Sequence, residues 1–449
     1  METVNKYLSG AIVPFAIVIF AFMFIFLLRG LPLSRPSKMI KILFEKGKKG
    51  EGSPIRAVIF ALAGTLGVGN IVGVASAIAM GGAGAVFWMW ISALLAMILK
   101  YCEVVLALLH RRVREDGYYG GAMYYMKDYF NSCHKFATGT VFSYIFVVLC
   151  LLNGGTMGCM IQSNSIAASL NEAFDFDEKT IGIALALLSA FVFFCKGKSL
   201  FALCEKLVPL VSILYVGMCM IIILSPNGEI LESFNKILND AFSFESAGAG
   251  AFGFLISRAL RFGTIRGLFS NEAGCGTSPI AHATSNTDSP CKQGILGIVE
   301  VFIDTIIVCS MTAFVVLKNE DIIAKYNSQP MLIVSKSFER ELGSGAVIIL
   351  SVCIFLFAFA TIICWGFYGK ECVYFVNKSK LSEKIYYSIY IALTFLGAFA
   401  SMDAVWELAD FAVGAMVLMN LYGLWKMKEE IKRETLASFN KKELPKRKL

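Results

Sequence analysis

The amino-acid sequence predicts an all-α polytopic membrane protein with about eleven transmembrane helices. The chain of 449 residues is 57% hydrophobic and only 16% charged. Its mean hydropathy of +0.67 is too high for a soluble globular protein. Apolar stretches of roughly 20 residues, the length that crosses a bilayer as a helix, recur along the whole chain. Two of these stretches are interrupted by glycine where an ordinary spanning helix would be continuous.

The first candidate span covers residues 11–28. It begins too late, and follows too little basic charge, for a cleaved signal peptide, so we interpret it as a retained helix. The other candidates fall near residues 57–80, 84–109, 138–168, 180–196, 202–225, 248–282, 293–317, 344–368, 384–400 and 404–425. No soluble domain fits in what remains.

The basic residues predict the orientation of the chain in the membrane. Lysine and arginine gather in residues 29–56, 110–115, 195–199 and 441–449, which lie on one side of the membrane if there are eleven spans. Cytoplasmic loops carry this excess, so the amino terminus is expected outside and the carboxyl terminus inside the cell (inner) membrane. The net charge of +8 reflects this bias, and no nucleic-acid partner is expected.

After the first helix, ten spans divide as five plus five, with a glycine break in the first member of each half. Because five is odd, the second half enters the membrane from the opposite face, which predicts an inverted-topology repeat. The expected units are an extra amino-terminal helix with its basic loop, two five-helix repeats, and a charged cytoplasmic tail: residues 1–53, 54–226, 227–425 and 426–449.

Three segments outside the spans show amphipathic helical spacing, and their sequences predict helices lying on a membrane face. They cover residues 122–130, 230–242 and 331–342. The two outer segments could act as lids or simply pack on neighbouring loops. The tail from Lys426 alternates in charge and predicts a solvated helix extension. The thirteen cysteines are scattered singly, without the paired spacing of a metal site, which favours small apolar packing residues.

The first glycine break is Thr65-Leu66-Gly67-Val68-Gly69-Asn70. Unwound backbone in a bilayer must be satisfied by protein, a cavity or a ligand. Freed carbonyls suit a cation and a helix start suits an anion, so one break could hold sodium and a carboxylate together. The Asn70 amide adds an oxygen ligand for a hard cation. Close helix packing is the competing interpretation of the glycines.

The second break places small polar residues, two glycines and a proline around Glu272. A carboxylate at membrane depth is costly unless it is paired, protonated or bound to an ion, so Glu272 is a candidate site residue. The alternative is a structural carboxylate that caps the freed N–H groups. Before this break lie Arg258, Arg261 and Arg266, which could line an outer vestibule, pair with Asp403, Glu407 or Asp410, or extend to the interface.

Other spans add isolated polar groups. Gln162 on the fourth span could donate to a substrate carboxylate or make an interhelical hydrogen bond. Thr361 and Trp365 lie four residues apart on one helix face, which suits a cation ligand beside an indole wall or ordinary packing. The intramembrane acids Glu300 and Asp304 could belong to an ion path or form an inward-facing structural pair.

Three long stretches resemble the alanine/glycine:cation symporter family, the sodium:alanine symporters. They are GTLGVGNIVGVASAIAMGGAGAVFWMW, GLFSNEAGCGTSPIAHATSNTD and FIDTIIVCSMTAFVVL, and the resemblance covers essentially the whole chain. It implies a LeuT-type fold of two inverted five-helix repeats with one extra amino-terminal helix. This chain has Gly82-Ala83-Gly84 where Gly-Pro-Gly is expected, and Cys275 and Thr277 also depart from the pattern.

The resemblance further implies the ligands. Sodium would be held by the backbone carbonyls of Ala63 and Leu66 and by the hydroxyl of Thr361, with Trp365 limiting the size of the pocket. The substrate-binding residues would be Gly67, Gly69, Asn70, Gln162, Ser270, Asn271, Glu272, Gly274, Gly276 and Trp365. Cys275 leaves the substrate preference open, because it could face the pocket.

The expected function is therefore sodium-coupled symport of a small neutral amino acid, alanine or glycine, into the cell by alternating access. No cofactor is expected beyond the co-transported sodium ion. The alternatives are proton coupling through Glu272 or Asp304, or a channel or receptor without coupled turnover. An enzyme is not expected, because no metal motif or GxSxG elbow lies within a span.

Overall fold

The computed structural model describes residues 2–34, 53–115, 117–195, 200–225, 230–242 and 258–439. Over these residues the fold is predominantly helical. The basic loop up to residue 52, the beginning of the 248–282 span and the basic tail from residue 440 are partly or wholly outside the described residues, so the predictions made for them are not addressed.

Seven helical segments in the described part of the chain are long and apolar enough to cross a membrane. They are Thr3–Leu27, Gly84–Leu109 (α6), Phe136–Phe174, Leu200–Ile223 (α11), Pro290–Leu317, Gly345–Val376 (α20) and Asp403–Lys426 (α22). Three are composite: α1 (Glu2–Tyr7), η1 (Leu8–Ile12) and α2 (Val13–Leu27); α8 (Phe136–Asn153), η3 (Gly154–Met160) and α9 (Ile161–Phe174); and α16 (Pro290–Val301), η6 (Phe302–Cys309) and α17 (Ser310–Leu317).

An eighth candidate span is bent. It consists of α4 (Pro54–Thr65) followed by η2 (Val68–Asn70) and α5 (Val72–Gly81), and the two halves meet at an angle of 62°. This confirms the interruption predicted in the 57–80 stretch. The remaining predicted spans correspond to α10 (Glu178–Ala190) with η4 (Phe191–Cys195), to α14 (Arg258–Asn271) with α15 (Pro279–His282), and to α21 (Lys380–Gly397). Seven or eight spans are therefore evident, and the count of eleven stays a prediction.

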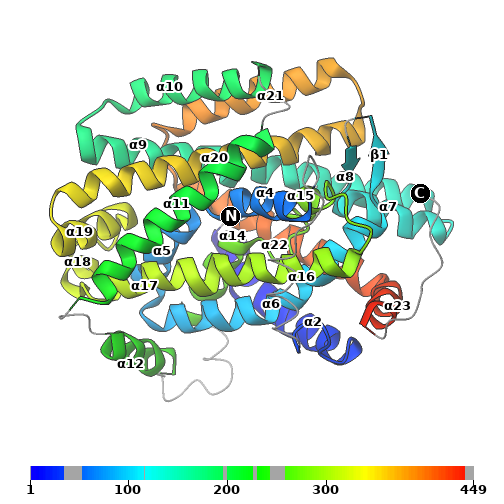
Figure 1. Ribbon diagram of the computed structural model, residues 1–449, viewed down its shortest axis with the longest axis horizontal. Helices are drawn as coiled ribbons and strands as arrows, with labels where there is room; N and C mark the ends of the chain where they lie inside the picture. The colour runs from blue at the N-terminus through cyan, green and yellow to red at the C-terminus, as the bar shows by residue number, and fades with distance from the viewer. Residues whose placement is uncertain are drawn as a thin grey trace.

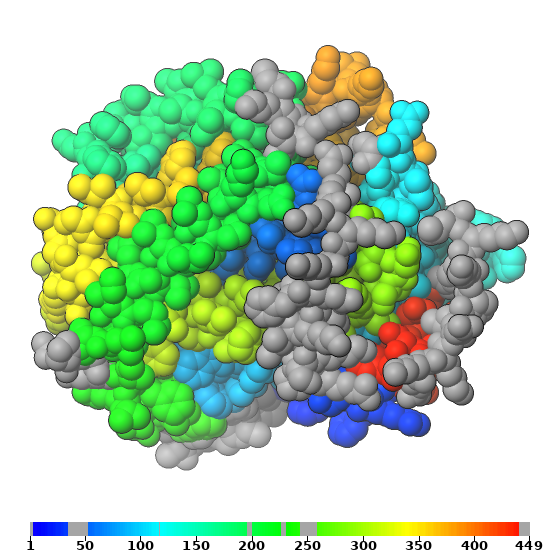
Figure 2. Space-filling view, in the orientation of Figure 1, coloured from blue at the N-terminus to red at the C-terminus, as the bar shows by residue number. Residues whose placement is uncertain are grey.

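The outer surface of the helices is apolar, as a lipid-facing surface must be. On α11, Leu210, Ile213 and Ile221 are 62%, 74% and 62% exposed. Figure 2 shows this helix running across one face of the molecule. In a soluble protein such a row of large exposed apolar side chains would be an aggregation hazard. Here it marks the surface that meets the bilayer.

The helix α6 lies at the centre of the packing. It contacts α14, α16, α2 and α12, and glycine allows the closest approaches. A Cβ atom at Gly263 of α14 would fall within 2.9 Å of the Trp88 side chain of α6, and one at Gly294 of α16 within 2.7 Å of Tyr101. In Figure 1, α4, α14 and α22 project to the middle of the molecule, whereas α10 and α21 run together along one edge.

The predicted amphipathic segments are helices. They form α7 (Ala122–Ser132), α12 (Ile230–Ala241) and α19 (Pro330–Leu342), and a short helix α18 (Glu320–Lys325) precedes the last of these. The helix α12 is docked onto the start of α6, because the Asp240 carboxylate accepts a hydrogen bond of 2.6 Å from the Gly84 N–H. This contact fits the packing interpretation of the outer segments.

Two expectations are corrected. The fold is not purely helical, because β1 (Arg112–Arg114) and β2 (Gly117–Tyr119) form an antiparallel hairpin in which Val113 pairs with Tyr118. The residues after Lys426 form α23 (Lys428–Phe439), which is not a simple solvated extension. Ile431, Thr435 and Phe439, spaced four residues apart, are buried on one side of this charged helix. The Thr435 hydroxyl lies 3.0 Å from the Tyr101 hydroxyl of α6.

Candidate functional site

The first break is where the chain leaves α4 and begins again at α5. Gly67 has an extended backbone (φ −128°, ψ −152°), so glycine is not required there by a left-handed conformation. Glycine is required because there is no room for a side chain: a Cβ atom would lie 2.6 Å from the Thr361 Oγ1 and 2.9 Å from the Gln162 Oε1. Three helices therefore meet at Gly67, a close approach that the conformational argument alone did not predict.

Polar side chains of the break itself and of other helices satisfy the backbone freed at this break. The Gly67 N–H donates to Asn70 Oδ1 and the Val68 N–H donates to Gln162 Oε1, both at 3.1 Å. The Thr361 hydroxyl lies 2.9 Å from the Ala63 carbonyl and 3.5 Å from the Leu66 carbonyl.

Five side chains and carbonyls predicted as ligands thus converge on one short segment. The N–H groups of Gly67 and Val68 suit an anion. The carbonyl oxygens of Ala63 and Leu66 and the Thr361 hydroxyl suit a hard cation. The predicted Gly69 lies at the same place for a steric reason, because its Cβ would be 3.2 Å from the Phe269 ring and 3.4 Å from the Ser270 Cα.

The second break separates α14 from the one-turn helix α15. Glu272, Gly274 and Gly276 all have left-handed backbone conformations, with φ of 52°, 86° and 79°. Glycine adopts this region freely, whereas Glu272 is held there at a cost of roughly 1–3 kcal/mol. The interruption predicted in this stretch is therefore present, with a strained residue at its centre.

The residues of the second break face two different sides. Ser270, at the end of α14, faces the first break, because its hydroxyl lies 2.8 Å from the Asn70 Nδ2. Asn271 donates to the Thr305 hydroxyl at 3.0 Å. The later residues face α6 instead, since the N–H groups of Gly274 and Gly276 both donate to the Glu103 carboxylate. Ser270 therefore meets the first break directly, while Gly274 and Gly276 lie against α6.

Glu272 does not cap the freed N–H groups, contrary to the structural alternative considered for it. That role belongs to Glu103, which also accepts a hydrogen bond of 2.7 Å from Asn420. Glu272 Oε2 accepts from the Thr277 hydroxyl at 2.6 Å, and its Oε1 is buried without a hydrogen-bond partner. The alternative was incomplete because it considered only residues of the broken stretch itself.

The two intramembrane acids of the eighth predicted span belong to different networks. Glu300 is bound by Lys100 at 3.2 Å and by His282 at 2.6 Å. Asp304, in η6, accepts hydrogen bonds from Asn70 and Ser270. They are therefore not a structural pair, because the π-helical turn between them directs Asp304 to the two breaks.

Sequence reasoning missed Lys100, Glu103 and Asn420, which are all buried. A signal existed, because Lys100 and Glu103 are charged residues inside the apolar 84–109 stretch, and charges at membrane depth mark polar networks. Asn420 carried a weaker signal as one amide in the last span. Its Oδ1 accepts from the Tyr125 hydroxyl, which links α22 to α7.

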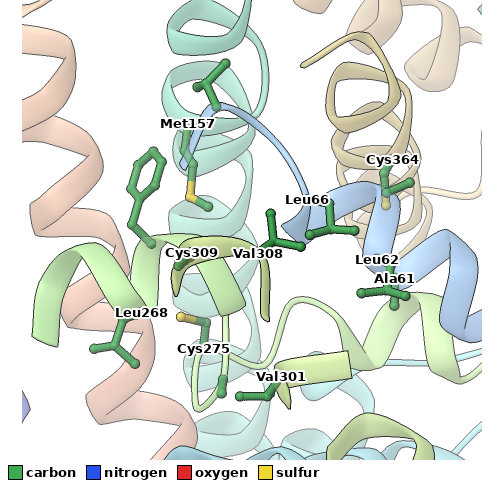
Figure 3. Close-up of a cluster of buried hydrophobic side chains, with 14 of the residues drawn as sticks. Ala61, Leu62, Leu66, Met157, Leu268, Cys275, Val301, Val308, Cys309 and Cys364 are labelled. Atoms are coloured by element: carbon green, nitrogen blue, oxygen red, sulfur yellow. The ribbon is translucent and has the colours of Figure 1, made fainter. Parts of the chain in front are cut away.

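Trp365 is fully buried one turn after Thr361 on α20. It packs against η3, since a Cβ atom at Gly158 would lie 2.5 Å from the Trp365 Cβ, and its ring Nε1 has no hydrogen-bond partner. Figure 3 shows side chains of both breaks, η3 and η6 around one buried apolar region, including Leu66, Cys275, Met157 and Val308.

Of the three arginines before the second break, Arg266 pairs with one of the predicted acids. Its guanidinium lies 3.1 Å from the Asp410 carboxylate and 4.4 Å from the centroid of the Trp406 ring. The pair joins α14 to α22. The interpretation of Arg266 as an ion-pair residue is therefore confirmed.

A bundle with two interrupted helices and buried polar groups between them is an arrangement used by membrane transporters. Among solved structures, the chain matches a Na⁺-coupled sialic acid symporter with a TM-score of 0.54 at 13% identity, over 92% of this chain and 87% of that one. The fold is therefore shared with a sodium-coupled symporter.

The sequence comparisons define the family. The profile of the sodium:alanine symporter family matches residues 1–448, and the chain belongs to this family. It is 33% identical to the sodium/alanine symporter AgcS of Methanococcus maripaludis, over 97% of this chain and 96% of the relative. It is 32% identical to the probable sodium/glutamine symporter GlnT of Bacillus subtilis, over 95% and 87%. The family and these relatives indicate a multi-pass membrane protein for sodium/amino acid symport.

Proposed function

We propose that this protein carries alanine or glycine into the cell together with sodium, by alternating access around the two helix breaks. The observation that carries the proposal is the convergence on Gly67. Residues 63–68 form one buried segment that offers the carbonyls of Ala63 and Leu66 and the N–H groups of Gly67 and Val68, and the Thr361 hydroxyl of α20 reaches this segment. A zwitterion and a sodium ion require these two kinds of ligand side by side.

Sodium would bind the carbonyls of Ala63 and Leu66 and the oxygen of Thr361. Because the Thr361 hydroxyl now donates to the Ala63 carbonyl at 2.9 Å, it must rotate to offer its lone pairs to the ion. The bound ion would then tie α20 to the end of α4. Ordering the break in this way raises the affinity for the amino acid, and linkage requires that the amino acid raise the affinity for sodium equally.

The substrate carboxylate would take the N–H groups of Gly67 and Val68, displacing the side-chain oxygens of Asn70 and Gln162 that accept from them. We further propose that Gly69, Ser270, Asn271 and Trp365 border the same site, with Trp365 limiting the substrate to a small side chain. Gly274 and Gly276 would act indirectly, by fixing the second break against Glu103, and Glu272 by binding the Thr277 hydroxyl within the break.

We infer eleven membrane crossings in two inverted five-helix repeats after the first helix, with the amino terminus outside. The similarity of the fold to a sodium-coupled symporter supports this architecture. In it, the breaks at Gly67 and Glu272 occupy corresponding positions of the two repeats.

The direct test is uptake of labelled alanine by proteoliposomes that contain the purified protein. An inward sodium gradient should drive accumulation, and replacement of sodium by potassium should abolish it. Equal uptake in both would contradict sodium coupling, and uptake driven by a pH gradient without sodium would favour proton coupling. Unlabelled internal alanine should accelerate entry of the label, which a channel would not show.

A further inference from the structure

The side-chain amide of Gln293 joins the start of α4 to His282 at the end of α15. Its Nε2 lies 3.3 Å from the Pro54 carbonyl and 2.9 Å from His282 Nδ1. An amide nitrogen carries two hydrogens, so it can donate to both acceptors at once. Gln293 and His282 are fully buried, and α4 and α15 lie side by side in the middle of Figure 1. In the proposed topology, this contact is at the cytoplasmic end of the two broken helices.

The arrangement requires a neutral His282. Its Nδ1 must offer a lone pair to the Gln293 amide, so the single ring proton is on Nε2. The Nε2 atom lies 2.6 Å from Glu300 Oε2, and its N–H donates to that carboxylate. The Pro54 carbonyl fixes the Gln293 amide in the same orientation, because a carbonyl can only accept. Two separate neighbours, Glu300 and Pro54, therefore specify one tautomer.

A second proton on the imidazole ring would reverse the contact with α4. The Nδ1 atom would then carry a hydrogen and face the hydrogens of the Gln293 amide nitrogen. A half turn of the amide lets Oε1, which has no hydrogen-bond partner among the described residues, accept from Nδ1. The same turn places this oxygen against the Pro54 carbonyl oxygen. An attraction at the start of α4 thereby becomes a repulsion.

The charges around His282 can balance a positive imidazolium. Glu300 is shared between His282 and Lys100, and Lys100 also donates to Ser278. Lys100 interacts with three buried carboxylates, so one positive charge faces three groups that can be negative. Further groups face this cluster: Glu103 of α6, Glu272 of the second break, Arg111 bound to the Ser285 carbonyl, Arg56 of α4, and the neutral Cys364 and Tyr368 of α20.

The helix α4 can move as a unit. It has 12 residues, is capped at its start by Ser53, and meets α5 at 62° across the unwound break, which can act as a hinge. Near its start it is also held by an ion pair of 3.2 Å between Arg56 and Glu205 of α11. The Glu205 side chain is 46% exposed, so this pair contributes little. The bond from Gln293 is therefore a main polar restraint on the inner end of α4.

We propose that His282 binds a proton from the cytoplasm, and that this proton turns the Gln293 amide and frees the inner end of α4. The proton enters and leaves on the cytoplasmic side and is not transported. This inference rests on the proposed alternating access and adds its regulation. Histidine changes its charge near neutral pH, and a ligand shifts an equilibrium toward the state that binds it better. Acid in the cytoplasm therefore favours the state that is open to the inside.

Cys364 reports the position of α4, because its buried thiol donates to the Phe60 carbonyl of α4 at 3.2 Å. The measurement is the rate at which N-ethylmaleimide labels Cys364, divided by the rate at the exposed Cys133, in potassium without alanine. Mass spectrometry separates the two sites, and Cys133 corrects for the effect of pH on maleimide chemistry. The ratio should be about tenfold higher at pH 6 than at pH 8, the factor expected for loss of one buried hydrogen bond.

Three variants separate the proton switch from a structural role. His282→Gln keeps one donor and one acceptor but does not titrate, so its ratio should be low at both pH values. Gln293→Met keeps the size of the side chain and removes the bond to Pro54, so its ratio should be high at both pH values. The matched control is His110→Gln, since His110 contacts α7 and α23. It should keep the pH response of the unchanged protein.

A pH response in His282→Gln as large as in the unchanged protein would overturn the proposal, and so would a higher ratio at pH 8. If His282→Gln does not fold, Gln293→Met decides the question, because slow labelling or a remaining pH response in this variant also contradicts the switch. The labelling requires no transport. It therefore decides on the switch even if alanine uptake is absent and the proposed function fails.

Discussion

Gly67 shows how a single residue defines the candidate site. The glycines of the first break predicted an interruption in the helix. The steric reason for Gly67 could not be predicted, because the residues that leave no room for a side chain lie on two other helices. Thr361 and Gln162 both approach the Gly67 Cα closely enough to exclude a side chain. The ligand roles of these residues stay predictions, while their convergence is a structural observation. Contacts between residues about 100 or 300 positions apart carry no local signal in one sequence.

Replacing Gly67 with valine should reduce sodium-driven alanine uptake at least tenfold. The new side chain would enter the space of the Thr361 hydroxyl and the Gln162 amide, and it would separate the groups proposed to hold sodium and carboxylate. The measurement is initial uptake, normalised to the amount of protein in the membrane. Gly217→Ala is the matched control, because no atom lies within 4 Å of its Cβ position in α11. Normal uptake by the valine variant would refute the site.

At the scale of elements, the first break was predictable and the support of the second was not. Glycine spacing and an apolar context indicated both interruptions. The anchor of the second break is the Glu103 carboxylate on α6, and although a charge inside that apolar span marks a polar network, the sequence does not say which backbone groups it binds. Glu103 accepts hydrogen bonds from the N–H groups of Gly274 and Gly276 and from the Asn420 amide, which joins α6, the second break and α22.

Glu103→Ala should destabilise the protein by roughly 2–5 kcal/mol, because it leaves two buried backbone N–H groups without an acceptor and removes one of the two acceptors of the Asn420 amide, which keeps the Gly274 carbonyl. Glu103→Gln keeps one acceptor oxygen and should cost less than half as much. Thermal unfolding of the purified protein in detergent, followed by size-exclusion chromatography, orders the three proteins. An alanine variant as stable as the unchanged protein would show that Glu103 does not anchor the break.

The stability of the protein should depend on pH through His110, which follows α6 and contacts Asp128 of α7 and Glu430 of α23. Burial opposes protonation and is the largest single effect, but the hydrogen bonds to the two carboxylates together outweigh it and raise the pKa of His110 above 6.5. The stabilisation that protonated His110 provides is therefore complete below about pH 6.5, and it is lost as the pH rises through the raised pKa of His110.

Thermal unfolding should accordingly have a higher midpoint at pH 6 than at pH 8.5, by roughly 1–2 °C. The difference should shrink in His110→Gln, which can still form hydrogen bonds but does not titrate. A pH effect of the same size in both proteins would place its origin elsewhere.

At the scale of the whole molecule, composition was sufficient to predict a polytopic helical membrane protein, and seven or eight spans are evident. The hairpin after α6 was not predictable, because each strand has only three residues. The packing of α23 was not predicted, because its few buried residues, Ile431, Thr435 and Phe439 among them, are interspersed with charged ones. Orientation follows from basic residues that lie partly outside the described segments, so it requires a chemical test.

Cys133 provides that test. It is exposed at the end of α7, whereas the other cysteines whose side chains the structure describes are buried. With the amino terminus outside, α7 lies on the cytoplasmic face. A membrane-impermeant maleimide should therefore label inside-out vesicles and leave right-side-out vesicles unlabelled, and Cys133→Ser should remove the signal. Labelling of Cys133 from the outside would reverse the predicted topology.

One interrupted helix is proposed to hold both the ion and the amino acid, and the affinity of the purified protein for labelled alanine in sodium and in potassium tests this. Alanine should bind at least tenfold more tightly in sodium, and the difference should be much smaller in Thr361→Ala, which lacks the hydroxyl proposed to bind sodium. Equal alanine affinity in the two salts would show that the ion and the amino acid do not share this helix.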